Sequence, residues 1–70
     1  MKFQITRTDI NKVVVKPFEF ADEAAAVGEY MSLLMLAGVI PMNRSGEAVE
    51  SLGDGNYRLS NGWPLKVAAA

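Results

Sequence analysis

The sequence predicts a small α+β domain, in which an antiparallel sheet made of an N-terminal and a C-terminal hairpin packs on one long helix in ββαβ(β) order. Three observations predict this fold. Apolar and polar residues alternate at the N-terminus, an alanine-rich apolar stretch lies between Asp22 and Gly38, and an Asn61-Gly62 turn joins two β-rich runs. The chain has 70 residues, so we expect a single domain over 1–70.

Residues 1–20 have the pattern of a β-hairpin. Phe3 and Ile5 alternate with polar neighbours, and the turn formers of residues 8–11 precede a second β-rich run that starts at Lys12. Pro17 lies inside this second run and cannot donate to a strand ladder. We therefore expect it at a sheet edge or at a bulge.

A helix is predicted over residues 22–37. Asp22 is suited to cap its first turn, and Gly38 to end it in a left-handed conformation. Helical spacing places the apolar residues on two adjoining inward stripes, which leaves a narrow outer face. The stripes are Ala24, Val27, Met31 and Leu34, and then Tyr30, Leu33 and Ala37; the outer face is Asp22, Ala25, Glu29, Ser32 and Leu36. Gly28 inside the helix costs about 1 kcal/mol relative to Ala, and close approach to a strand or to a partner would explain it.

The remainder of the chain contains one ambiguous segment and one hairpin. Residues 45–52 fit a short helix ended by Gly53, or a strand that turns at Asp54-Gly55 and places Glu50 opposite Leu59; the short helix is the preferred interpretation. Residues 56–67 form the C-terminal hairpin. A three-residue loop at 60–62 brings the apolar residues of both strands to one face, whereas a two-residue turn divides them. The last three alanines are expected to fray.

The composition excludes the common catalytic sites. The chain has no histidine and no cysteine, and its serines lie in no recognisable nucleophile motif. Asp22 and Glu23 are adjacent at a helix start, where the helix dipole explains them. The segment 53–56 resembles a fragment of a calcium loop but lacks the further acidic ligands, and is interpreted as a turn. We expect no enzyme activity, no metal and no cofactor.

The surplus of apolar residues favours binding to another protein. Half of the residues are hydrophobic, and a chain this short buries only a small core. The candidate interaction surface is acidic: Asp22, Glu23, Glu29, Glu47, Glu50 and Asp54. An alternative basic surface on the first hairpin is made of Lys2, Arg7, Lys12 and Lys16, and would suit a nucleic-acid-associated regulator. A self-assembling homo-oligomer is the third hypothesis, because the apolar helix stripe is broad.

The N-terminal residues contain no apolar secretion signal, and the longest apolar stretch, residues 30–42, is too short to span a membrane. We expect a cytoplasmic protein with no membrane contact.

The layout of the chain also carries a family resemblance. A start of Met1-Lys2-Phe3-Gln4-Ile5-Thr6, a helix beginning at residues 21–26 and a hairpin through Asn61-Gly62 together resemble the small inhibitor proteins of phages and mobile elements, anti-CRISPR proteins among them. The resemblance implies stoichiometric inhibition, in which a rigid surface docks on a host complex and blocks it without catalysis. It transfers no site residues.

Overall fold

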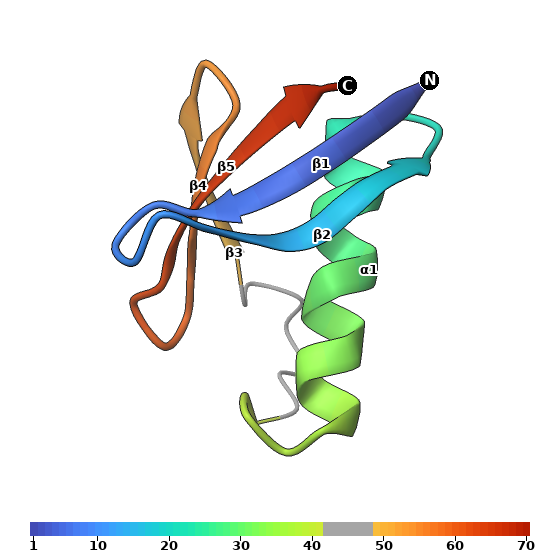
Figure 1. The fold of residues 1–70 in the computed structure, drawn as a ribbon. Helices are drawn as coiled ribbons and strands as arrows, with labels where there is room; N and C mark the ends of the chain where they lie inside the picture. Colours follow the sequence, from blue (N-terminus) through green and yellow to red (C-terminus); the bar gives the residue numbers. More distant parts are fainter. Residues whose placement is uncertain (42–48) are drawn as a thin grey trace.

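A computed structural model describes residues 1–41 and 49–70 and shows an α+β fold of one five-stranded antiparallel sheet and one helix (Figure 1). The elements follow the chain as β1 (Lys2–Arg7), β2 (Lys12–Glu19), α1 (Glu23–Leu36), β3 (Val49–Gly53), β4 (Asn56–Leu59) and β5 (Pro64–Ala69). The strand order in the sheet is β2-β1-β5-β4-β3. The last strand of the chain therefore lies at the centre of the sheet and joins the two hairpins.

The position of β5 corrects the expectation that the final alanines fray. The strand runs to Ala69 and pairs with β1 along its length, with Phe3 opposite Ala69. The backbone N–H of Ala70 also donates to the carbonyl of Lys2 at 2.8 Å. Small side chains suffice here because the main-chain ladder holds the segment in place.

The helix begins and ends where the sequence predicts. The Asp22 carboxylate accepts a hydrogen bond from the N–H of Ala25 at 2.8 Å, which caps the first turn. At the other end, Gly38 adopts a φ of +76°, its N–H donates to Met35, and the N–H of Val39 donates to Leu34. These two hydrogen bonds form a Schellman motif, which ends α1 and turns Ile40 back into the core.

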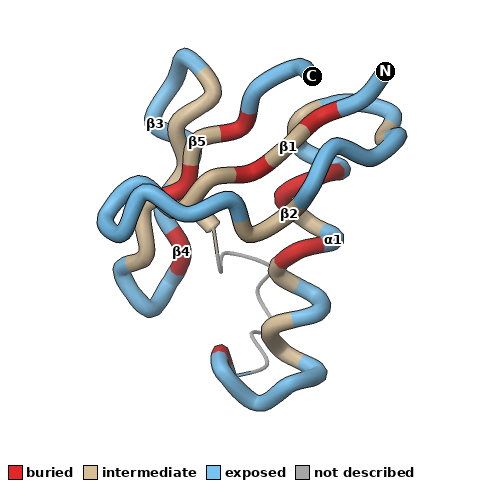
Figure 2. The backbone as a smooth tube through the Cα atoms, in the orientation of Figure 1, coloured by how far each residue is buried: buried red, intermediate tan, exposed pale blue. Residues whose placement is uncertain are grey.

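The predicted faces of the helix are partly wrong. Ala26, Val27 and Tyr30 are buried, whereas Ala24, Leu33 and Ala37 are exposed. The exposure of Leu33 and Ala37 follows from the position of α1 on the sheet: only its N-terminal half lies over the strands, and its C-terminal half extends past them (Figures 1 and 2). The core itself fills the space between the helix and one face of the sheet. It consists of Phe3, Ile5, Ala26, Val27, Tyr30, Ile40, Leu59, Leu65 and Val67.

Residues 49–53 form a strand, so the preferred short helix is wrong for the described part of 45–52; residues 45–48 lie outside the described part of the chain. Val49 pairs with Leu59, and Glu50 with Arg58 rather than with Leu59. The apolar residues of this segment are compatible with a helical face as well as with a strand; they are Ala48, Val49 and Leu52. Pairing with β4, a contact that local sequence patterns do not contain, decides between them.

The predicted three-residue loop of the C-terminal hairpin is confirmed. The N–H of Leu59 donates to Trp63, Tyr57 pairs with Leu65, and Gly62 has a φ of +91°. Leu59, Leu65 and Val67 are buried on the face toward α1. Glycine serves at the last loop position because an L side chain rarely adopts this backbone conformation.

Candidate functional site

An apolar groove of about 480 Å³ lies between strand β2 and helix α1. Its apolar lining comes from Val15, Phe18 and Phe20 on the strand side and from Tyr30 and Leu33 on the helix. Two of these side chains are largely exposed, Phe18 at 64% and Leu33 at 52%. The Phe18 and Phe20 rings lie 5.5 Å apart at an angle of 59°, so the strand side presents a tilted aromatic pair.

Strand β2 reaches this arrangement through a bulge. Val15 pairs with Ile5 and Phe18 with Phe3, so Lys16 and Pro17 together oppose Gln4 alone. In a regular strand Val15 and Phe18 would point to opposite faces, because they are three residues apart. The extra residue brings both side chains to the face of the sheet that carries α1. The bulge at Pro17, which the sequence anticipates, therefore builds the strand side of the groove.

The free edge of β2 is unsuited to pairing with another strand. A second irregularity lies between Ile5 and Thr6, where Val14 is the extra residue. Two bulges, a proline without an N–H and the charged residues Lys12 and Lys16 interrupt the regular row of donors and acceptors that strand addition needs. The groove is therefore suited to contacts through side chains.

Three charged side chains line the same groove: Lys16, Glu19 and Glu29. Glu19 is already engaged, because its carboxylate forms an ion pair with the N-terminal amine of Met1. Within residues 1–41 and 49–70, Lys16 and Glu29 take part in no ion pair. Both side chains are exposed, so they are accessible to charges on another molecule.

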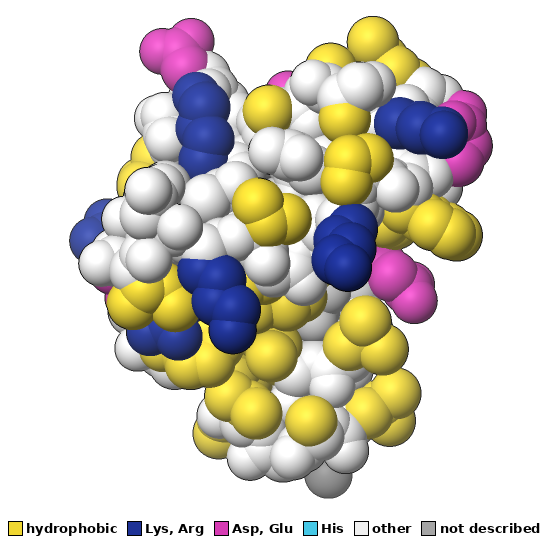
Figure 3. All heavy atoms as spheres, in the orientation of Figure 1, with side chains coloured by type: hydrophobic (Ala, Val, Ile, Leu, Met, Phe, Trp, Pro, Cys, Tyr) yellow, Lys and Arg dark blue, Asp and Glu magenta, His cyan; other side chains and the backbone are white. Residues whose placement is uncertain are grey.

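Hydrophobic side chains extend past the groove along the helix. Leu33 and Leu36 follow Glu29 at helical spacings of four and seven residues, so the three share one face. Leu36 is 83% exposed. In Figure 3 the region around the C-terminal half of α1 shows mainly hydrophobic side chains. We call Phe18, Leu33 and Leu36 the apolar patch.

The five acidic residues of the predicted surface that the structure describes do not come together on one surface. Asp22 caps α1, and Glu23 accepts a long hydrogen bond of 3.5 Å from the hydroxyl of Tyr57. Glu29 lines the groove. Glu50 forms an ion pair with Arg58 at 2.9 Å. Arg58 lies between the inward-facing Tyr57 and Leu59, so this pair is on the opposite face of the sheet.

The remaining two acidic residues of the predicted surface are Asp54 and Glu47. Asp54 lies in the turn between β3 and β4 with a φ of +53°, and Glu47 falls outside the described residues. Of the six, Glu29 alone is a groove residue among those that the structure describes.

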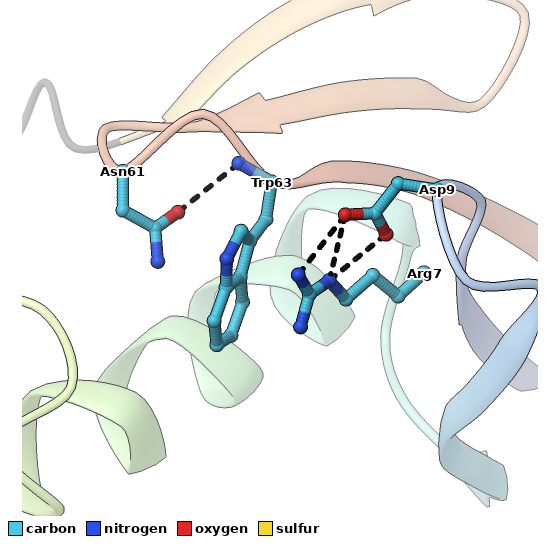
Figure 4. A network of polar contacts seen from close by, with 4 residues as sticks. All are labelled: Arg7, Asp9, Asn61 and Trp63. Carbon is cyan, nitrogen blue, oxygen red and sulfur yellow. Dashed lines mark hydrogen bonds and ion pairs between the residues drawn. The ribbon is translucent and has the colours of Figure 1, made fainter.

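The four basic residues of the alternative surface are likewise dispersed. Arg7 binds Asp9 and lies against the Trp63 ring, 3.9 Å from its centroid (Figure 4). Lys2 pairs across the ladder with Glu19, and Lys12 with Arg7. Lys16 lines the groove. Arg7 and Lys12 are thus neighbours, Arg7 and Lys2 lie beside carboxylates, and Lys16 lies apart in the groove, so the four residues do not form one continuous basic strip.

Neither the acidic nor the basic surface predicted from the sequence includes Phe18, Leu33 or Leu36. One signal for them was present, since α1 contains only two charged side chains, Glu23 and Glu29. A helix whose outer face meets water normally carries more charge.

Two further observations concern metal binding and tyrosine chemistry. Within residues 1–41 and 49–70, no group of three or more potential metal ligands is close enough to hold an ion. Burial raises the pKa of the Tyr57 hydroxyl, and the nearby Glu23 carboxylate adds to that increase. A tyrosine shifted in this direction stays protonated and is a poor base at neutral pH.

No helix of the described segments has the length and apolar character required to cross a membrane. Comparison with protein families, with curated proteins and with solved structures finds no match to this chain.

Proposed function

We propose that this chain is a non-enzymatic protein-binding module that docks stoichiometrically on a partner protein through the apolar patch and the groove beside it. The observation that carries the proposal is the exposure of Phe18 and Leu33 on the two sides of one groove. Contiguous exposed apolar surface of this kind marks interaction sites in small proteins. Aromatic anchors such as Phe18 contribute strongly to binding when they enter a pocket of the partner.

The mode of action that fits this surface is occlusion. Because the edge of β2 is unsuited to strand addition, the partner is held by side chains of β2 and α1. A docked chain would cover the partner's surface and exclude its other ligands. This is the inhibition of a host complex that the resemblance to phage inhibitor proteins implies.

A pull-down from lysate of the source cell tests the proposal. The bait is compared with two variants, Leu33→Asp in the patch and Leu52→Asp on β3. The wild-type leucines have nearly equal exposure, 52% and 50%, so both variants place a charge on an equally accessible site. Circular dichroism and thermal unfolding serve as controls that test whether both variants fold.

We expect wild type and Leu52→Asp to recover the same protein in a fixed ratio, with or without nuclease, and Leu33→Asp to lose it. Recovery that is equal for all three baits would overturn the assignment of the surface. Recovery that disappears after nuclease treatment would instead support binding to nucleic acid.

A further inference from the structure

The solvent-facing side of α1 has almost no charge. Its exposed residues include Ala24, Ala25, Ser32 and Leu36, and Glu29 is the one charged side chain among the exposed helix positions. Gly28 belongs to the same side, and among the residues that the structure describes a Cβ added there would meet nothing within 4 Å. Close approach to one of the five described strands, one of the two predicted reasons for this glycine, is therefore excluded. An uncharged outer face is typical of a helix that is covered by another helix or sheet.

The charges around the apolar patch are self-complementary. Lys16 from the strand and Glu29 from the helix line the same groove, and neither forms an ion pair within residues 1–41 and 49–70. A two-fold symmetric interface brings the same surface of two copies together, so a residue i that meets residue j is matched by j meeting i. If residue i is the cation and residue j the anion, both symmetry-related contacts join opposite charges.

We infer that the free chain forms a two-fold homodimer that covers the apolar patch, with Lys16 of each copy facing Glu29 of the other. The inference rests on the proposed function, because it assigns a second copy as the occupant of the same patch when the partner is absent. Dimer formation then regulates the site, since a partner binds only by displacing the second copy. Chains in this state hide their apolar surface from water.

An interface of standard size takes about 800 Å² from each copy, so the dimer would cover the groove and the outer helix face together with the apolar patch. Phe18, Leu33 and Leu36 form the apolar centre, and the small residues of the outer helix face permit a close approach of the second copy. Lys16 and Glu29 lie at the rim, where charge pairs select the orientation of the two copies.

Sedimentation equilibrium of purified chains tests the charge pairing, with the variants Lys16→Glu and Glu29→Lys. Each single variant places like charges opposite one another twice in the dimer, and we expect its dissociation constant to rise about tenfold. An equimolar mixture of the two variants should recover the dimer, because both contacts in the mixed dimer join opposite charges. The double variant should recover it as well.

Lys12→Glu and Glu50→Lys serve as matched controls, because they make the same charge changes outside the groove. We expect each control to dimerise like the wild type, and their mixture to show no added association. Wild type that stays monomeric at high micromolar concentration would overturn the inference. So would single variants that dimerise normally, or a mixture that stays as monomeric as its components.

These outcomes are distinct from a failure of the proposed function. A monomeric wild type that still captures its partner through Leu33 would overturn the dimer and leave the binding function intact. A dimer that dissociates in Leu33→Asp, combined with partner recovery unaffected by that substitution, would establish self-association and overturn the assigned docking surface.

Discussion

The guanidinium of Arg7 lies over the indole of Trp63, 3.9 Å from the ring centroid, and joins the end of β1 to the start of β5 (Figure 4). Asp9 holds the guanidinium in place, with its carboxylate 2.9 Å from Nε. The Asn61 side chain accepts a hydrogen bond from the N–H of Trp63 at 3.1 Å and fixes the other partner. Two turns far apart in sequence are thus connected by one cation–π contact.

Replacement of Arg7 by Ala should lower the free energy of unfolding by about 1–2 kcal/mol, because it removes the contact with the ring and the packing of the arginine stem. Trp63 is the only tryptophan in the chain, so its fluorescence reports directly on this site. We expect its emission to change in the folded variant. Lys12 is the exposed cross-strand neighbour of Arg7, and Lys12→Ala should change neither the free energy of unfolding nor the Trp63 emission. Equal effects of the two substitutions would contradict the role of the contact between Arg7 and Trp63.

Two isoleucines on the first hairpin provide a matched test of the core. Ile5 is 0% exposed, whereas Ile10 lies in the turn and is 53% exposed. Ile5→Ala should lower the free energy of unfolding by about 2–5 kcal/mol, and Ile10→Ala should change it by no more than about 0.5 kcal/mol. Urea unfolding followed by circular dichroism measures both. Similar values for the two variants would show that Ile5 is not a core residue.

Two glycines should respond to alanine in opposite directions. Gly55 has a φ of +79°, and a Cβ there would lie 2.6 Å from the carbonyl oxygen of Val67. Gly55→Ala should therefore destabilise the chain by about 2–4 kcal/mol, through backbone strain and the steric clash. Gly28→Ala should stabilise it by about 1 kcal/mol, because the helix gains propensity and none of the described residues obstructs the methyl group. Urea titrations at low protein concentration give both values; a destabilised Gly28→Ala would mean that an unseen contact occupies that site.

Local signals were sufficient for much of the fold. The cap at Asp22, the left-handed Gly38 and the loop ended by Gly62 depend on a few neighbouring residues, and all three appear as predicted. The strand at Val49–Gly53 could not be identified in this way, because its conformation depends on pairing with β4. A central position for β5 was equally out of reach, since no short-range pattern states which strands become neighbours.

The candidate site was less predictable for a related reason. The exposure of Leu33 depends on how far α1 extends past the sheet, and helical spacing alone placed this residue on an inward stripe. The direction of Phe18 depends on the number of residues in the bulge at Lys16 and Pro17. Both are tertiary features. The described acidic residues do not form one surface for the same reason, because they lie on different elements: Asp22, Glu23 and Glu29 at or on α1, Glu50 on β3 and Asp54 in the turn that follows it.

Alkaline pH should weaken the fold through Tyr30. Burial raises the pKa of this hydroxyl above its ordinary value of 10.0, and the positive charge of Arg7 only partly opposes the increase. Between 10.0 and the higher folded-state pKa, the unfolded chain releases the proton and the folded chain retains it. The contribution of Tyr30 to stability is therefore complete below pH 10 and is lost as the pH rises through the folded-state pKa.

Urea unfolding at pH values on both sides of 10 measures this loss, and Tyr30→Phe, which cannot ionise, is the matched variant. We expect the stability of wild type to fall more steeply than that of Tyr30→Phe above pH 10, and parallel curves would show that the Tyr30 hydroxyl has the same pKa in both states.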